Sequence, residues 1–275
     1  MQLTIGFSPC PNDTFIFDAL IHHKIDTEGI QFTPVLHDVE ALNLWAIEGR
    51  LDITKLSYGV LPVVTETYSL LDSGSALGKG VGPLLISNVA CSKLSIAEQR
   101  IAIPGENTTA HLLFSLRYPD AKNKIFLRYD AIEDFVLQGK GAGVIIHENR
   151  FTYEAKGLLK ITDLGQYWEQ QTAVPIPLGG IVVKKSIARE LQLKISRLIK
   201  NSIEYAFTKY PVLNDYIKNN AQEMGEEVMR KHIELYVNNF SLHLGMEGRS
   251  AVLKLIEIYE KMHKVTVNKE NIFVG

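Results

Sequence analysis

Strand-like and helix-like segments alternate along the first two thirds of the chain, and this alternation is the feature that most limits its fold. Short runs with strand character lie at residues 3–7, 30–36, 51–55, 84–87, 100–103, 125–128 and 143–147. Helical spacing of apolar residues fills most of the intervals, as in residues 39–47, which Asp38 is placed to cap. Asp130 and Glu133 form a capping-box-like pair before another helix. This β-α-β pattern predicts an α/β fold with mostly parallel sheets and helices on both faces.

Two similar runs, at 82–87 and 178–183, bracket the second series of strands and helices. Each has small or rigid residues followed by a short apolar stretch, as expected of two paired strands that cross between two lobes. The predicted boundaries are 1–85 and 178–275 for lobe one, 90–175 for lobe two, and 83–88 and 178–184 for the crossover strands. Beyond Lys185 the pattern is helical, which predicts a helical C-terminal tail. Ligands of such folds bind in the cleft, at the C-terminal ends of strands.

Composition narrows the classes of partner. The 275 residues have a formal charge of −2 and no block of five like charges, so nothing favours nucleic acid or an anionic membrane. No stretch approaches the ~18 apolar residues of a membrane span, and no secretory signal follows Met1, so we expect a cytoplasmic protein. Cys10 and Cys91 lack the spacing of a zinc site, which predicts two free thiols and no metal. The sequence does not indicate the oligomeric state.

Two segments after predicted strands carry candidate binding residues. The segment 8–15 contains Ser8, Pro9, Asn12 and Asp13, and its prolines make it either a rigid strand-to-helix turn or a binding loop. In the segment 54–58, Lys55 and the hydroxyls of Ser57 and Tyr58 could hold an anion; the alternative is an exposed surface lysine. Asn12, Asp13 and Thr14 could also cap the helix that follows.

A third segment, Gly105 to Ala110, opens a predicted helix. Backbone N–H groups and the helix dipole there favour an anion, and the hydroxyls of Thr108 and Thr109 add donors. A plain helix cap is the compatible alternative. The lysine and glycine spacing of a phosphate loop is missing.

His147 is the last residue of the predicted strand 143–147, so its ring can reach the cleft. Neutral imidazole is a good base near pH 7, whereas the alternative is a hydrogen-bonded core residue. Among the other histidines, His37, His111 and His243 could approach a cleft, and surface positions are predicted for His22, His23, His232 and His263.

Taken together, these motifs resemble the 1,4-dihydroxy-6-naphthoate synthase family of the futalosine route to menaquinone. The residues that carry the resemblance are 8–15 (SPCPNDTF), 52–58 (DITKLSY), 73–78 (SGSALG), 80–84 (GVGPL), 104–105 with 108–110 (PG, TTA), and 143–148 with 150–153 (GVIIHE, RFTY). The resemblance extends to about residue 185. It implies a two-lobed type 2 periplasmic-binding-protein-like fold with central mixed sheets flanked by helices.

The resemblance also implies a reaction and roles. The enzyme would be a carbon–carbon lyase that converts cyclic dehypoxanthine futalosine, a small carboxylated molecule, to 1,4-dihydroxy-6-naphthoate, without a metal or an organic cofactor. His147 would be the base. Lys55, Leu56, Ser57, Thr108, Thr109 and Ala110 would contact the substrate, and Ser8, Pro9, Asn12 and Asp13 would line the pocket.

Two alternatives share the fold. One is chorismate dehydratase, an enzyme of the same pathway, which the proline-rich start at Ser8 and the segment around His147 disfavour. The other is a non-catalytic protein that binds small anions, and a secreted receptor of that kind would carry a signal peptide. Fold alone does not choose among the three.

Overall fold

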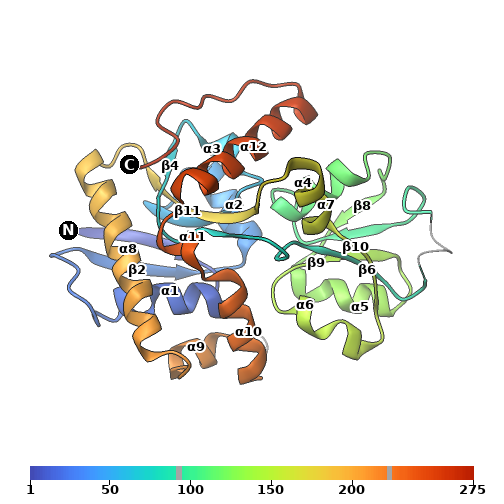
Figure 1. Ribbon diagram of the computed structural model, residues 1–275, viewed down its shortest axis with the longest axis horizontal. Coiled ribbons are helices and arrows are strands. Elements are labelled where there is room, and N and C mark those ends of the chain that lie inside the picture. Colours follow the sequence, from blue (N-terminus) through green and yellow to red (C-terminus); the bar gives the residue numbers. More distant parts are fainter. Residues whose placement is uncertain (91–94, 222–224) are drawn as a thin grey trace.

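The computed structural model describes residues 1–90, 95–221 and 225–275. It contains two β-sheets that lie side by side, each covered by helices (Figure 1). The N- and C-termini both lie in the half that contains the first sheet. None of the helices in the described ranges combines the length and the apolar character needed to cross a bilayer.

The first sheet is mixed. Its strand order is β2-β1-β3-β11-β4, and β5 pairs with β11. The strands are β1 (Gln2–Phe7), β2 (Gln31–Leu36), β3 (Ile53–Ser57), β4 (Tyr68–Leu70), β5 (Ala76–Gly78) and β11 (Ile176–Lys184). Strand β1 runs parallel to β2 and β3, whereas β11 is antiparallel to β3, β4 and β5. The carboxyl ends of β1 and β3 therefore meet at one edge of the sheet, where ligands of α/β folds bind.

The second sheet has the order β10-β6-β9-β7-β8. Its strands are β6 (Leu84–Ser87), β7 (Ile101–Ile103), β8 (Lys124–Phe126), β9 (Ala142–Ile145) and β10 (Leu159–Asp163). Strand β7 is parallel to β8 and β9, whereas β6 is antiparallel to β9 and β10. Both sheets are thus mixed.

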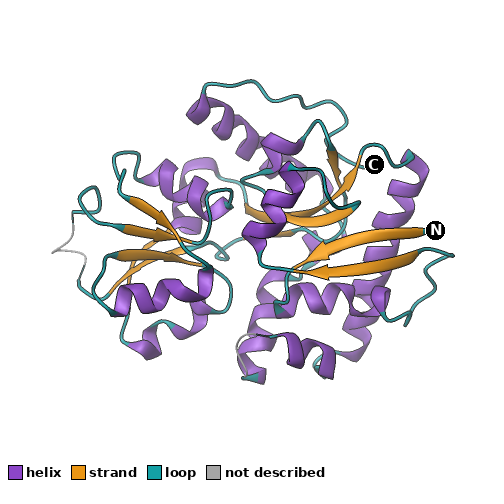
Figure 2. Ribbon diagram, turned by 180° about the vertical axis from the view of Figure 1, so that it is seen from behind, coloured by secondary structure: helices purple, strands orange, loops and turns teal. Residues whose placement is uncertain are grey.

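Helices cover the faces of both sheets (Figure 2). Around the first sheet lie α1 (Pro11–Ile21), α2 (Val39–Ile47), α3 (Leu61–Val64), α8 (Arg189–Lys209), α9 (Asp215–Asn220), α10 (Glu226–Tyr236), α11 (Asn239–Leu242) and α12 (Gly245–His263). Around the second lie α4 (Thr109–Arg117), α5 (Ile132–Leu137), α6 (Asn149–Thr152) and α7 (Leu164–Thr172), with 3₁₀ turns at Tyr129–Ala131 and Glu154–Lys156. The predicted helical tail is confirmed.

Apolar packing holds each sheet to its helices. Helix α8 buries Ile195, Leu198 and Ile199 in a cluster that includes Phe15 and Ile16 of α1. This face has the helical spacing seen in the sequence. Another cluster joins residues of both sheets, from Leu56 of β3 to Ile101 of β7, and includes the fully buried Trp168. Burying large side chains of this kind stabilises a fold by about 1.5–3 kcal/mol each.

The two runs predicted to form paired crossover strands do not pair with each other. Leu84–Ser87 is β6 of the second sheet, and 178–183 lies in β11 of the first. The partner of β11 at its amino end is β5, a three-residue strand that precedes the run at 82–87. The similarity between the two runs reflects buried strands in separate sheets.

Two local predictions were wrong for identifiable reasons. The capping box at Asp130 and Glu133 does not form, because Asp130 pairs with Arg128 and Glu133 accepts from Asn149 and Lys156. Strand β9 ends at Ile145, so the base candidate follows the strand in a turn. The cap at Asp38 is confirmed, since its carboxylate accepts from the N–H groups of Glu40 and Ala41.

Candidate active site

A pocket of about 720 Å³, its mouth included, is lined by residues from both halves of the molecule. It is lined from the first sheet by residues after β1 and within β3, and from the second by the start of α4 and the turn after β9. The pocket contains ten of the eleven residues proposed from the sequence: Ser8, Asn12, Asp13, Lys55, Leu56, Ser57, Thr108, Thr109, Ala110 and His147.

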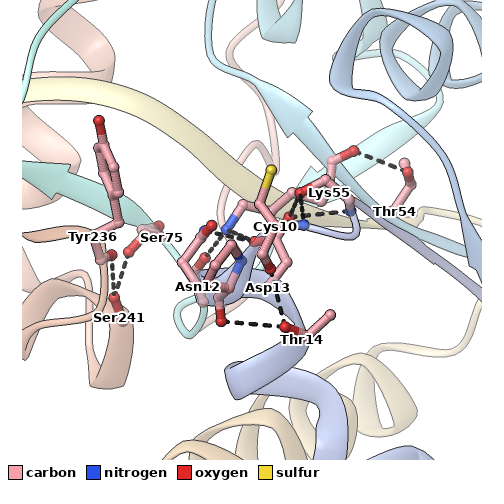
Figure 3. A network of polar contacts seen from close by, with 12 residues as sticks. Cys10, Asn12, Asp13, Thr14, Thr54, Lys55, Ser75, Tyr236 and Ser241 are labelled. Atoms are coloured by element: carbon pink, nitrogen blue, oxygen red, sulfur yellow. Dashed lines mark hydrogen bonds and ion pairs between the residues drawn. The ribbon is translucent and has the colours of Figure 1, made fainter. Parts of the chain in front are cut away.

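Asp13 is the centre of a buried polar network in this pocket (Figure 3). Its Oδ2 accepts from the backbone N–H of Ser8 at 3.1 Å and from the Ser8 hydroxyl at 2.7 Å. Its Oδ1 accepts from the side-chain amide of Asn12 at 2.8 Å and lies 3.1 Å from Nζ of Lys55. Four donors thus surround one carboxylate that is only 2% exposed. A buried charge with so many partners fixes the conformation of the segment that holds it.

Lys55 is buried, so the surface-lysine alternative is wrong. The residue is 6% exposed, and its Nζ also donates to the backbone carbonyl of Gly74 at 3.0 Å. An ammonium group has three donors, and Asp13 and Gly74 take two of them. Because Lys55 lines the pocket, its third N–H can serve a bound anion.

The turn between β1 and α1 explains why Asp13 points inward. Pro11 occupies the first position of α1, where its missing N–H costs nothing, and Cys10 is the N-cap without a side-chain cap bond. Asp13 therefore lies inside the first turn and binds back to Ser8. Thr14 donates to the Cys10 carbonyl. The expected capping by Asn12, Asp13 or Thr14 is thus wrong, since the helix begins earlier than predicted.

Helix α2 connects Ser57 to the loop before α4. Asn43 is fully buried; its side-chain oxygen accepts from the Ser57 N–H at 2.8 Å, and its amide donates to the Ser57 hydroxyl and to the Asn107 carbonyl. Glu40 accepts from both the backbone and side-chain N–H groups of Asn107. Burial raises the pKa of Glu40 above its ordinary value. These contacts join the first-sheet half to the second-sheet half beside the pocket.

The threonines at the start of α4 are mostly engaged by protein groups. Thr108 is the N-cap, and its hydroxyl accepts from the His111 N–H. The Thr109 hydroxyl accepts from the Gly59 N–H at 2.9 Å and donates to the Leu178 carbonyl at 2.7 Å. Gly59 allows this approach, because a Cβ there would lie 2.7 Å from the Thr108 carbonyl oxygen. Any anion at this helix start would therefore meet backbone N–H groups rather than the Thr109 hydroxyl.

His147 lies in the turn after β9 with a φ of 56°, in the left-handed region that non-glycine residues seldom adopt. Its Nδ1 lies 3.7 Å from Sγ of Cys10, and its covered Nε2 has no hydrogen-bond partner among the described residues. Burial lowers the pKa of His147 to about 4, against the opposing negative charge of Asp13. The imidazole is therefore neutral at neutral pH, with a lone pair available to accept a proton.

His232 of α10 was wrongly predicted to lie on the surface. It is fully buried, and its ring stacks on that of His147 with centroids 6.0 Å apart. Charged neighbours in sequence suggested exposure, yet Met229, His232 and Ile233 share the buried face of α10 with Tyr236. That 3/4 spacing is the signal that could have identified it.

Residues 3–261 match the model of a protein family described as menaquinone biosynthesis. The chain belongs to this family. The Thermus thermophilus 1,4-dihydroxy-6-naphthoate synthase is 45% identical over 254 residues, 92% of each chain. The Streptomyces coelicolor protein of the same name is 38% identical over 261 residues, 92% of this chain and 91% of that one. The family resemblance inferred from the motifs is confirmed.

The fold of this menaquinone-biosynthesis family member is also confirmed. A Candida albicans gene product with the generic periplasmic binding protein fold superposes with a TM-score of 0.69. The alignment covers 99% of this chain and 93% of that chain at 12% identity, which concerns the fold alone. The two-sheet arrangement with a helical tail agrees with it.

Within the family member, one predicted site residue, Pro9, lies apart from the main pocket. Pro9 lines an adjoining cavity of about 580 Å³, which shares Ser8 and His147 with the pocket.

Cys10 is a buried free thiol, as expected, whereas Cys91 lies outside the described residues. Potential metal donors from Cys10, His147 and Glu148 lie within 4.8 Å of one another. Sequence spacing could not reveal this group, because its members come from separate segments.

Proposed function

We propose that the protein is a 1,4-dihydroxy-6-naphthoate synthase, a carbon–carbon lyase that acts on cyclic dehypoxanthine futalosine. One observation carries this proposal: a neutral histidine with an unpartnered ring nitrogen lines a pocket built from the same segments that resemble the family. The 45% identity to a relative of that name supports the choice of substrate.

His147 acts as the general base in this proposal. Its ring removes a proton from the bound substrate, and the electron pair left behind drives cleavage of the carbon–carbon bond. Formation of an aromatic ring in the product supplies driving force. The negative charge of Asp13 favours the imidazolium that results from the transfer. General-base catalysis of this kind typically contributes about 10²–10⁴-fold in rate.

The remaining pocket residues bind and orient the substrate. The third N–H of Lys55 donates to the substrate carboxylate, and the apolar side chains of Leu56, Ala110 and Leu178 face the rings. Burial of these groups excludes water, which strengthens the charge interaction between Lys55 and the carboxylate. No added cofactor takes part in the proposed step.

We also propose that the chain forms two lobes, with residues 1–85 and 178–275 in one and 90–175 in the other. The separate sheets and the pocket between them support this division. The contacts of Glu40 and Asn43 with Asn107 would then hold the lobes in a closed arrangement.

Turnover of defined substrates tests the function. The purified, chelator-treated protein is incubated with cyclic dehypoxanthine futalosine, and the products are followed by liquid chromatography and mass spectrometry. We expect stoichiometric formation of 1,4-dihydroxy-6-naphthoate. Consumption of chorismate in a parallel incubation would identify the dehydratase instead. Tight binding of the futalosine derivative without turnover would identify a binding protein and reject the lyase.

A further inference from the structure

Four side chains that commonly bind transition metals gather beside the pocket. Cys10 lies at the start of α1, His147 and Glu148 follow β9, and His232 lies on α10. Donor atoms of Cys10, His147 and Glu148 all lie within 4.8 Å of one another. The Nε2 of His232 lies 3.8 Å from Oε2 of Glu148. Thiolate, imidazole and carboxylate together form the donor set of many zinc sites.

His232 is the second, independent sign of a ligand. The residue is 0% exposed, and neither of its ring nitrogens has a hydrogen-bond partner among the described residues. A buried imidazole without partners loses the hydrogen bonds that water would give it, so native proteins seldom keep one without a role. The Nε2 atom of His147 is also buried and has no hydrogen-bond partner among the described residues. A metal ion would give one of the two ring nitrogens of His232 a partner.

The separations between donors suit a tetrahedral ion. With zinc–ligand bonds of about 2.0–2.3 Å, donor atoms around Zn²⁺ lie roughly 3.3–3.7 Å apart. The distance from Cys10 Sγ to His147 Nδ1 is 3.7 Å, and the distance from Glu148 to His232 is 3.8 Å. Cys10, His147 and Glu148 are therefore close enough to share one ion, and His232, which lies outside that group of donors, would have to shift toward it.

We propose that Cys10, His147, Glu148 and His232 form an inhibitory Zn²⁺ site. Binding releases the thiol proton of Cys10 to solvent, and the thiolate and the Glu148 carboxylate together balance the two charges of the ion. Coordination occupies the lone pair that His147 needs as a base. Zinc therefore competes with catalysis, and the active form of the enzyme is metal-free.

Calorimetric titration with Zn²⁺ alone tests the site without reference to activity. The full-length protein is treated with EDTA, desalted and titrated in parallel with H232F, C10S and the control H243A. His243 is exposed and contacts Asp72 on another part of the surface. We expect one saturable site in the wild type and in H243A, with affinity at least about 100-fold weaker in H232F and C10S. Zinc should also raise the melting temperature of the wild type but not of H232F.

Cobalt adds a readout that involves the thiol directly. Co²⁺ bound to the wild type and to H243A should give a thiolate-to-metal charge-transfer band in the near ultraviolet, which C10S lacks. If H232F does not fold, the zinc affinity of C10S compared with that of the wild type still tests the site. The proposal is overturned if the wild type has no saturable Zn²⁺ site, or if C10S binds zinc as tightly as the wild type does.

Activity then tests inhibition separately. One equivalent of Zn²⁺ should abolish turnover by the wild type, and EDTA should restore it. A zinc site in a protein without lyase activity would reject the proposed function and leave the metal site standing. Lyase activity insensitive to bound zinc would reject the inhibitory role.

Discussion

The two walls of the pocket differ in how completely their polar groups are satisfied. On the binding wall, defined by Ser8, Asp13 and Lys55, one buried carboxylate has four donors around it. The base wall is defined by His147, which lines the pocket, and by Cys10 and His232, which contact its ring. Three of the four histidine ring nitrogens there have no hydrogen-bond partner among the described residues. Saturated networks make a surface rigid, whereas unpartnered groups are costly and remain available for chemistry. The difference indicates that one wall holds the substrate and the other reacts with it.

Removing the base should produce the largest effect. His147→Asn keeps the approximate size and some hydrogen bonding but cannot accept the proton, so kcat should fall by about 10²–10⁴-fold. The melting temperature should change little, because Nε2 has no partner to lose among the described residues. Steady-state kinetics measures kcat, and calorimetry measures the melting temperature. His37→Asn, at the adjoining cavity, is the matched control and should keep kcat close to the wild-type value.

Asp13→Asn changes the central residue of the binding wall and should lower the stability of the fold. The buried ammonium of Lys55 would lose its counter-charge, and breaking a buried pair in this way costs about 3–5 kcal/mol. Denaturant unfolding measures the change. Asp130→Asn removes the partner of Arg128 in an exposed pair and should cost about 1 kcal/mol or less. Equal costs for the two variants would mean that the buried network does not stabilise the fold.

Lys55→Met should weaken binding more than it slows the reaction. Asp13 keeps its contacts with Ser8 and Asn12, so the fold should survive. Loss of a charged hydrogen bond of about 1.5–3 kcal/mol corresponds to a KM roughly 10–100-fold higher, with kcat nearly unchanged. Lys160→Met, on an exposed position of β10, is the control. If KM did not change, Lys55 would be a purely structural residue.

Thr109→Val tests the junction between the walls and should have the smallest effect. The substitution keeps the shape but leaves the Gly59 N–H without its acceptor, at a cost of about 1–3 kcal/mol. The Leu178 carbonyl loses one donor and keeps the Tyr58 N–H. Thr172→Val removes a bond to a carbonyl of its own helix and a long one, at 3.4 Å, from the Val174 N–H, and it should cost less because the residue is only partly buried. Thermal unfolding compares the two. A Thr109→Val protein as stable as the wild type would show that this junction contributes nothing.

Local chemistry predicted the parts of the fold that depend on neighbouring residues. Asp38 caps α2 because its carboxylate reaches N–H groups two and three residues ahead. The buried face of α8 follows from helical spacing alone. By contrast, Asp130 and Glu133 looked equally suited to capping, but partners distant in sequence engage Glu133. Strand β5 has three residues and exists because β11 pairs with it, so no local pattern could predict it.

The sequence predicts which segments of the chain meet at the pocket, but not which of their side chains contact each other. Strand ends and a helix start bring Lys55, Thr108 and His147 to one pocket, as the β-α-β pattern predicts. The ion pair between Asp13 and Lys55 depends on the register of β1 against β3, which the sequence does not reveal. His232 joins the base wall through the packing of α10.

The account rests on a division of labour between the two walls, and product binding by His147→Asn tests it most directly. Isothermal titration of 1,4-dihydroxy-6-naphthoate into the wild type and the variant gives the two Kd values, measured on the same chelator-treated proteins used for kcat. The account predicts Kd values within about threefold of each other, while kcat differs by about 100-fold or more. A Kd that rises in parallel with the loss of kcat would contradict it, since His147 would then be a binding residue.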